Sequence, residues 1–196
     1  VDFDTAQRIE SRYFVELATG RVAKNMIKAF FFDLQKISSG ASRPKDIPQT
    51  LPKKVGILGA GMMGQGIAYS TATVGIPCVL KDVTLEGAEK GKAHSEGLLD
   101  KALSRGKTTQ AQCDALLARI LPTTRYEDLQ GCDLVIEAVF EDRAIKAECT
   151  RKAEAVIAAD AVFASNTSTL PITGLAQVSS RPANFLGLHF FSPVDK

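Results

Sequence analysis

Three glycines and an aspartate have the types and the spacing that bind the phosphates and a ribose of a dinucleotide. Gly59, Gly61 and Gly64 form a G-x-G-x-x-G motif, and Asp82 lies 21 residues after Gly61. The first two glycines let the backbone turn tightly against a pyrophosphate, and the third lets the next helix pack on the preceding strand. A carboxylate at Asp82 can accept both ribose hydroxyls of NAD and would repel a 2′-phosphate. The motif therefore predicts an NAD site.

A histidine and a serine that follow apolar runs are the candidates for proton chemistry. His189 lies beside aromatic residues. Imidazole is the side chain best suited to take up or release a proton near neutral pH. Beside a nicotinamide it is the natural general base, because oxidising an alcohol by hydride transfer requires removal of the hydroxyl proton. Taken alone, His189 is equally consistent with a core histidine. Ser168 could bond the same substrate oxygen, or it could cap the helix that follows.

Two glutamates and a lysine lie around the end of the run 134–139 and have two interpretations each. Glu137 and Glu141 could bind ribose or carboxamide, or influence the charge of His189, but they could also be exposed acids at the end of a strand. Lys146 lies one turn into the following helix and could reach the cofactor. It could equally belong to a solvated helix face that has no such role.

Alternating strands and helices are needed to position these residues. The apolar runs predict strands over 55–59, 77–82, 120–123, 133–139, 161–164 and 184–190. Helices are expected over 62–74, 85–105, 108–119, 142–159 and 171–177, with a turn or short helix over 125–130. This order predicts an α/β fold, a Rossmann-like, doubly wound and mostly parallel sheet with an inserted helical hairpin at 85–119. The polar strand ends should then meet at one edge, where such sheets bind ligands.

The first 52 residues form a separate region. Residues 1–37 carry apolar side chains at helical spacing and predict a linker helix, followed by a polar, proline-containing connector. Such an apolar stripe has to be buried against something. It could pack on the body of this chain or dock on a domain outside it. The expected domains are therefore 1–52 as linker helix and connector, and 53–196 as the NAD-binding domain.

Composition excludes several classes of protein. The 196 residues carry a net charge of +2 and no basic stripe with interleaved aromatic residues, so nucleic acid is not an expected partner. The four cysteines form no C-x-x-C pair, which argues against a metal site and favours buried thiols in a reducing, cytoplasmic compartment. No apolar run reaches the roughly 18 residues of a membrane span.

Five segments, taken in their order, resemble the NAD-binding domain of L-3-hydroxyacyl-CoA dehydrogenases. They are 59–68, Asp82, 135–141, 163–168 and 187–193, and the resemblance covers 53–196. It implies oxidation of L-3-hydroxyacyl-CoA to 3-ketoacyl-CoA with NAD in fatty-acid β-oxidation. His189 matches the catalytic base, Ser168 the serine that contacts substrate and nicotinamide, and Glu141 the glutamate that closes the strand motif. The implied cofactor contacts are Gly59, Gly61, Met62, Met63, Gly64, Asp82, Val139, Phe140, Glu141, Lys146, Ser168 and Ser192.

The resemblance also implies partners outside this chain. The N-terminal helix resembles the connector of multifunctional fatty-acid oxidation enzymes, in which an enoyl-CoA hydratase domain precedes the dehydrogenase. In the family a later glutamate orients the imidazole, and a helical domain supplies an asparagine and a dimer surface. The chain stops at Lys196, before these groups. An imidazole without a partner has no fixed tautomer, so this chain is expected to bind NAD but to be weakly active or inactive.

Three further interpretations remain open. The basic residues of the hairpin could face CoA phosphates or form a solvated basic face; they are Lys90, Lys92, Lys101, Arg105 and Lys107. The chain could belong to a β-hydroxyacid dehydrogenase that acts on free acids. It could also be a non-catalytic NAD-binding or assembly module with residues 1–37 as its partner surface.

Overall fold

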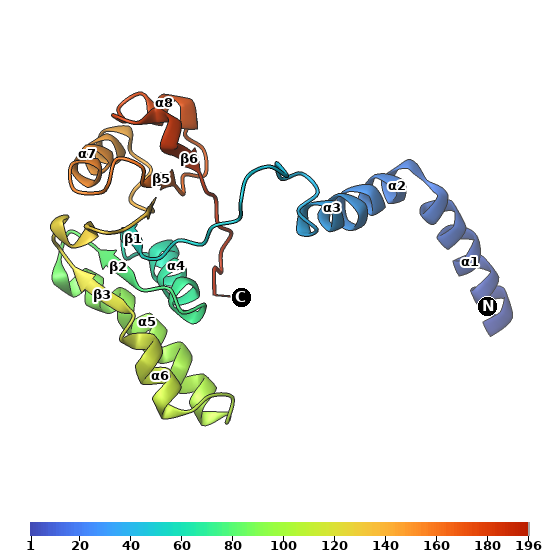
Figure 1. Ribbon diagram of the computed structural model, residues 1–196. Coiled ribbons are helices and arrows are strands. Elements are labelled where there is room, and N and C mark those ends of the chain that lie inside the picture. Colours follow the sequence, from blue (N-terminus) through green and yellow to red (C-terminus); the bar gives the residue numbers. More distant parts are fainter. Residues whose placement is uncertain (196) are drawn as a thin grey trace. The chain divides into compact units, whose positions relative to one another are not determined.

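A computed structural model describes residues 1–195, and the chain divides into two units, Val1–Thr50 and the residues from Leu51 onward. The first unit is helical, with α1 (Phe3–Thr19), α2 (Arg21–Ile27), the π-helical turn η1 (Lys28–Asp33) and α3 (Leu34–Ser38). Asp2 caps α1 by accepting the N–H of Thr5 at 2.8 Å. Gly20 is extended and separates α1 from α2, where the chain bends (Figure 1). The linker helix is therefore present, but it is interrupted.

The helices of the first unit have no core of their own. None of the residues in α1, α2, η1 and α3 is buried. Large apolar side chains such as Phe14, Leu17, Val22 and Phe30 are exposed along it. Within residues 1–195, no helix is both long enough and apolar enough to cross a membrane.

The second unit is built on a six-stranded sheet. Its strands are β1 (Val55–Leu58), β2 (Cys78–Lys81), β3 (Ile120–Thr123), β4 (Leu134–Glu137), β5 (Val162–Ser165) and β6 (Phe185–Gly187). They lie in the order β3-β2-β1-β4-β5-β6, and each neighbouring pair is parallel. This confirms the Rossmann-like, doubly wound sheet. The strand order reverses between β1 and β4, so ligands are expected at the carboxyl ends of these two strands.

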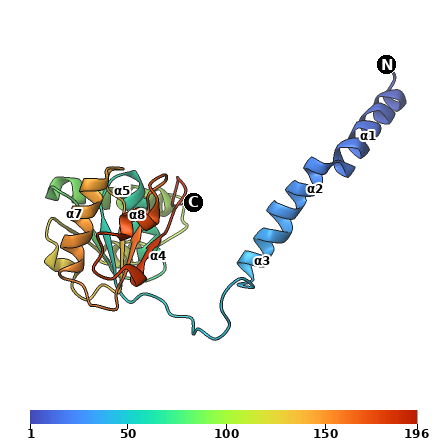
Figure 2. The same ribbon diagram turned by 90° about the horizontal axis from the view of Figure 1, so that it is seen from above.

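Side chains that alternate along the strands assign the helices to two faces. Ile57 and Leu80 pack with α4 (Met62–Thr73), α5 (Leu85–Ser104) and α6 (Gln110–Leu117). Leu58, Val79 and Phe163 point the other way, toward α7 (Arg143–Glu154) and α8 (Ile172–Ala176). Short 3-10 turns lie at Glu127–Leu129 and Pro182–Asn184. Figures 1 and 2 show the sheet between these two layers.

The inserted helical hairpin is confirmed as α5 and α6. Thr84 caps α5 by accepting the N–H of Gly87 at 3.1 Å. A capping box starts α6, because Thr109 accepts the N–H of Gln112 and the side chain of Gln112 accepts the N–H of Thr109. These local caps explain why two helices form here in place of one long helix.

Helix α7 and strand β6 end at least three residues earlier than the sequence predicts. Helix α7 stops at Glu154 instead of 159, because the guanidinium of Arg181 donates to the carbonyl oxygens of Glu154 and Ala158. Strand β6 stops at Gly187 instead of 190, since the N–H of Phe190 is taken by a side chain of the neighbouring loop. Both partners come from distant parts of the chain, which a local pattern does not reveal.

We expect Glu154→Gln to lower the free energy of unfolding by about 1–3 kcal/mol at pH 7, because three charge-assisted hydrogen bonds are weakened. The carboxylate accepts the hydroxyl of Ser179 and both the N–H and the hydroxyl of Ser180, at 2.5, 2.7 and 2.7 Å. Partial burial acts to raise the pKa of Glu154, but these donors and Arg181 hold it below its ordinary value of 4.5.

The difference between the two proteins should depend on pH in a defined direction. A lowered folded-state pKa adds stability above the unfolded-state pKa, and this stability is lost as the pH falls through the folded-state pKa. The gap between wild type and Glu154→Gln should therefore shrink below about pH 4.5. Urea unfolding at pH 7 and in acid measures it. A gap that stays constant into acid would assign the loss to packing instead of charge.

Candidate functional site

The turn between β1 and α4 is built from glycines that leave room for a ligand. Gly59 has a φ of +94°, and a Cβ there would lie 2.6 Å from the carbonyl oxygen of Ala138. A Cβ on Gly64 would come within 1.7 Å of the carbonyl oxygen of Gly59, so the start of α4 packs directly on the turn. A Cβ on Gly61 would meet no atom within 4 Å. Strain and close packing therefore account for Gly59 and Gly64, whereas open space lies over Gly61.

The amino end of α4 and the carboxylate of Asp82 face the same turn. Gly61 is the N-cap of α4 and supplies no side-chain cap, which leaves N–H groups of the first turn for an anion. Asp82 accepts the N–H of Ala60 at 2.7 Å and the N–H of Val83 at 2.6 Å, one on each oxygen. Each oxygen keeps a second lone pair, so the carboxylate is held in place and can still accept ribose hydroxyls.

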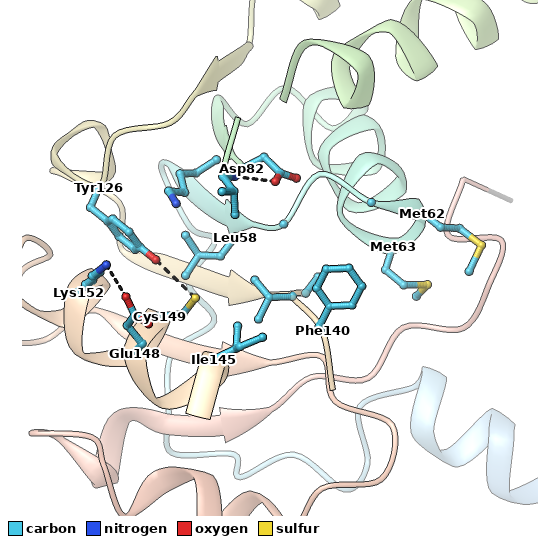
Figure 3. Close-up of a pocket in the computed structure, with 16 residues that line it drawn as sticks. Leu58, Met62, Met63, Asp82, Tyr126, Phe140, Ile145, Glu148, Cys149 and Lys152 are labelled. Carbon is cyan, nitrogen blue, oxygen red and sulfur yellow. Dashed lines mark hydrogen bonds and ion pairs between the residues drawn. The ribbon is translucent and has the colours of Figure 1, made fainter. Parts of the chain in front are cut away.

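A cavity of about 770 Å³ opens over this turn (Figure 3). Its volume lies within the range of small-molecule sites, and its walls are mostly apolar, with Asp82 among the few polar groups. Seven of the residues that the sequence predicts as cofactor contacts line it, namely Gly59, Gly61, Met62, Met63, Asp82, Val139 and Phe140. The open glycine, the uncapped helix and the fixed carboxylate together fit NAD.

One wall of the cavity comes from residues that the sequence analysis did not single out. Ile145 and Cys149 lie one helical turn apart on α7 and face the cavity, and Tyr126 donates its hydroxyl to the sulfur of Cys149 at 3.4 Å. Burial raises the pKa of Tyr126, and Cys149 adds to that effect. The ammonium of Lys81 lies 4.3 Å from the centre of the Tyr126 ring. The i, i+4 spacing in the first helix after β4 is the signal that could have indicated this wall.

The charged residues at the end of β4 and in the segment that follows it form a cluster around a buried ion pair. Glu137 is 1 % exposed and Lys146 is 2 % exposed, and their charged groups are 2.7 Å apart. Lys146 also lies 3.1 Å from Glu141. The interpretations of Glu137 as an exposed strand-end acid and of Lys146 as part of a solvated helix face are therefore wrong.

Glu141 connects this cluster to the end of β5. One of its oxygens accepts the N–H of Ser168 at 2.6 Å and the hydroxyl of Thr167 at 3.0 Å. Partial burial acts to raise the pKa of Glu141, but the Ser168 N–H, Lys146 and Thr167 hold it below its ordinary value. Glu141 is thus an ionised acceptor that holds the backbone at Ser168 in place and leaves the Ser168 hydroxyl exposed.

His189 follows β6 and has a partner within the chain. Its Nδ1 lies 3.2 Å from the carbonyl oxygen of Thr167, and its ring meets Phe191 edge-on at 4.9 Å between centroids. Asn166 adds a second tie, because its side-chain oxygen accepts the N–H of Phe190 at 2.8 Å. The expectation of an imidazole without a partner is therefore wrong. The alternative of a core histidine is also wrong, since His189 is exposed.

The remaining predicted residues do not line the cavity. Gly64 is buried beneath the turn, and Glu141, Lys146 and Ser168 belong to the hydrogen-bonded network described above. The hydroxyl of Ser192 is exposed and lies 3.9 Å from the sulfur of Met62. Over residues 1–195, no three His, Cys, Asp or Glu side chains come together to hold a metal ion.

A parallel sheet with a glycine turn, an aspartate after β2 and an apolar cavity at the strand ends defines a dinucleotide-binding domain of the dehydrogenase type. The chain belongs to the family described as 3-hydroxyacyl-CoA dehydrogenase, NAD binding domain, whose model matches residues 54–196. The cofactor of this family is NAD.

Known proteins with similar sequences and structures agree with this assignment. The fatty acid oxidation complex subunit alpha of Pseudomonas aeruginosa is 39 % identical over 191 residues, which are 97 % of this chain and 26 % of that protein. The structure of (S)-3-hydroxybutyryl-CoA dehydrogenase from Ralstonia eutropha is 40 % identical with a TM-score of 0.70, covering 74 % of this chain and 51 % of that one. For 3-hydroxybutyryl-CoA dehydrogenase from Escherichia coli the identity is 32 %, the TM-score 0.71, and the coverage 74 % and 31 %. The chain thus spans about a quarter of the curated relatives it matches.

Proposed function

We propose that this chain forms the NAD-binding half of an L-3-hydroxyacyl-CoA dehydrogenase, which oxidises the 3-hydroxyl group to a ketone in fatty-acid β-oxidation. The observation that carries the proposal is the position of His189. It follows β6 at the same sheet edge as the dinucleotide cavity, and its ring is held by the carbonyl of Thr167, the residue before Ser168. A base at that edge suits an alcohol substrate, because hydride transfer to a nicotinamide requires that the hydroxyl proton be removed.

Each predicted catalytic residue has a defined part in this proposal. Bound NAD supplies the hydride acceptor. His189 donates its Nδ1–H to the Thr167 carbonyl, which leaves Nε2 as the acceptor for the hydroxyl proton. Ser168 offers its hydroxyl to the substrate oxygen, and Glu141 holds Ser168 by its backbone N–H. Val139, Phe140 and Ser192 complete the cofactor contacts that we propose, and Lys146 acts on the site through Glu137 and Glu141.

The rest of the protein is proposed from the longer relatives. We propose a parent chain with an enoyl-CoA hydratase domain before this segment and a helical domain after it, oligomeric and located in the cytoplasm. Four free cysteines within the chain support a reducing compartment. We expect the 196-residue chain alone to oxidise 3-hydroxyacyl-CoA slowly, because His189 and Phe191 are exposed and water is not excluded from the base.

A titration of this chain with NADH and with NADPH tests the cofactor part of the proposal. The chain has no Trp, so nicotinamide fluorescence can be followed with little protein background. We expect NADH to bind and NADPH to bind much more weakly. Asp82→Asn should weaken NADH binding by about tenfold, since hydrogen bonds to a charged acceptor are lost, and should narrow the gap to NADPH.

Glu89→Gln is the matched control, because it removes the same charge from an exposed side chain on α5. It should leave both dissociation constants within about twofold, as expected for a screened surface charge. Equal binding of NADH and NADPH by the wild-type chain, or an unchanged ratio in Asp82→Asn, would contradict the assignment of Asp82 to the ribose.

A further inference from the structure

The three charged side chains at the end of β4 and after it, Glu137, Glu141 and Lys146, form one network of hydrogen bonds and ion pairs. Glu137 Oε1 accepts the ammonium of Lys146 at 2.7 Å and the N–H of Val139 at 2.9 Å, and its Oε2 accepts the hydroxyl of Ser165 at 2.8 Å. Glu141 Oε2 lies 3.1 Å from the same ammonium. Each of these partners donates to a carboxylate oxygen, as expected when both glutamates are ionised.

The ammonium of Lys146 is enclosed by acceptor atoms of this chain. It carries three N–H groups, and three acceptors surround it, Glu137 at 2.7 Å, Glu141 at 3.1 Å and the carbonyl oxygen of Val139 at 3.4 Å. In this arrangement Lys146 influences the site through the carboxylates of Glu137 and Glu141. Two negative charges and one positive charge give the cluster a net charge of −1, with Glu137 and Lys146 buried and the Glu141 side chain 41 % exposed.

The cluster lies between two parts of the proposed cofactor site. On one side it holds Val139, which lines the cavity, through both its N–H and its carbonyl oxygen. On the other side Glu141 holds the N–H of Ser168, next to the residue whose carbonyl binds His189. A fixed charge at this place acts on whatever occupies the edge between Val139 and Ser168, since water is excluded from Glu137 and Lys146.

We propose that Glu137 is a specificity-determining residue, which gives this cluster its net negative charge and thereby favours the oxidised over the reduced form of the cofactor. The inference rests on the proposed function, because it requires the nicotinamide end of NAD to lie at this edge. The nicotinamide ring is positive in NAD⁺ and neutral in NADH, so only the oxidised form is attracted by the cluster. Glu137 acts through charge, since its oxygens are used by Lys146, Val139 and Ser165.

The test compares the dissociation constants of NAD⁺ and NADH in wild type and in Glu137→Gln. NADH is titrated by its fluorescence, and NAD⁺ is titrated as a competitor of NADH. The variant keeps the shape of the side chain and makes the cluster neutral. We expect the ratio of the NAD⁺ to the NADH dissociation constant to rise on the order of tenfold, as for the loss of one unit charge several ångströms away at a protein edge.

A second variant separates charge from structure. Glu137→Gln combined with Lys146→Met restores the net charge to −1, so the ratio should return toward the wild-type value. Glu154→Gln is the control for lost stability, because it neutralises another buried carboxylate at the far end of α7. It should leave the ratio unchanged.

Three results would decide against the inference or against its basis. An unchanged ratio in Glu137→Gln, with both forms bound, overturns it. If Glu137→Gln does not fold, Glu141→Gln makes the same charge change at a side chain that is 41 % exposed, and an unchanged ratio there overturns it as well. Wild-type chain that binds neither form of the cofactor would contradict the proposed function instead, before any variant is compared.

Discussion

Replacing His189 with alanine in the full-length protein should lower the turnover of L-3-hydroxyacyl-CoA by about 10²–10⁴-fold, the usual contribution of a general base. Affinity for NADH should stay within about twofold, because His189 does not line the dinucleotide cavity and follows the last strand of the sheet. Its ring is exposed, so its loss should also leave the free energy of unfolding within about 0.5 kcal/mol. The measurements are steady-state rates, an NADH titration and urea unfolding.

The second histidine of the chain provides the control for this prediction. His94 lies on α5, and His94→Ala should keep turnover near the wild-type value. Retained turnover in His189→Ala would assign the proton transfer to another group. Loss of NADH binding together with turnover would mean that His189 supports the structure of the site instead of the chemistry.

Asn166 and Thr167 hold the candidate base with contacts from within this chain. The side-chain oxygen of Asn166 accepts the N–H of Phe190, which follows His189 in the sequence. The carbonyl oxygen of Thr167, which follows Asn166, accepts a hydrogen bond from the imidazole of His189. Two successive residues of the β5 loop thus fix both the backbone and the ring of the candidate base. A sequence pattern could place Asn166 after a strand, but it could not reveal which N–H the amide would bind.

The fold was predictable where the pattern of side chains is local. Strands β1 and β2 consist almost entirely of buried residues, and such apolar runs between glycine turns are typical of parallel strands covered on both faces. The helix ends were less predictable. Helix α7 ends where Arg181, 27 residues away from Glu154, supplies the capping donors, and this contact exists only once the chain has folded.

The candidate site also contains residues whose roles could be predicted from the sequence and residues whose roles could not. The glycine turn and Asp82 were predictable from their spacing, because the motif marks the positions where a Cβ would prevent the tight turn, the approach of a pyrophosphate or the packing of the helix. The buried cluster was not, since Lys146 and Glu141 on either side of a helix start have the same sequence pattern as a solvated helix face. The two carboxylates and Ser165 make the burial of Lys146 possible, and they come from two different strand ends.

The two glycines at the start of α4 should respond in opposite ways to the same substitution. Gly64→Ala places a Cβ 1.7 Å from the carbonyl oxygen of Gly59, so the helix has to move away from the turn. We expect a loss of roughly 3–5 kcal/mol in the free energy of unfolding, a size reserved for severe overpacking. Thermal or urea unfolding measures it, and NADH binding should be lost together with the packing of the turn.

Gly61→Ala should instead keep the fold and lose the ligand. Its φ of −67° suits alanine, and its Cβ would meet no protein atom within 4 Å, so the cost in stability should stay below about 1 kcal/mol. That open space is part of the cavity and is where a pyrophosphate would approach the backbone, so NADH affinity should fall by more than about tenfold. If Gly61→Ala bound NADH like the wild type, the phosphates would not lie over this turn. If both variants lost stability equally, Gly61 would be a packing residue, and the separation between its role and that of Gly64 would be wrong.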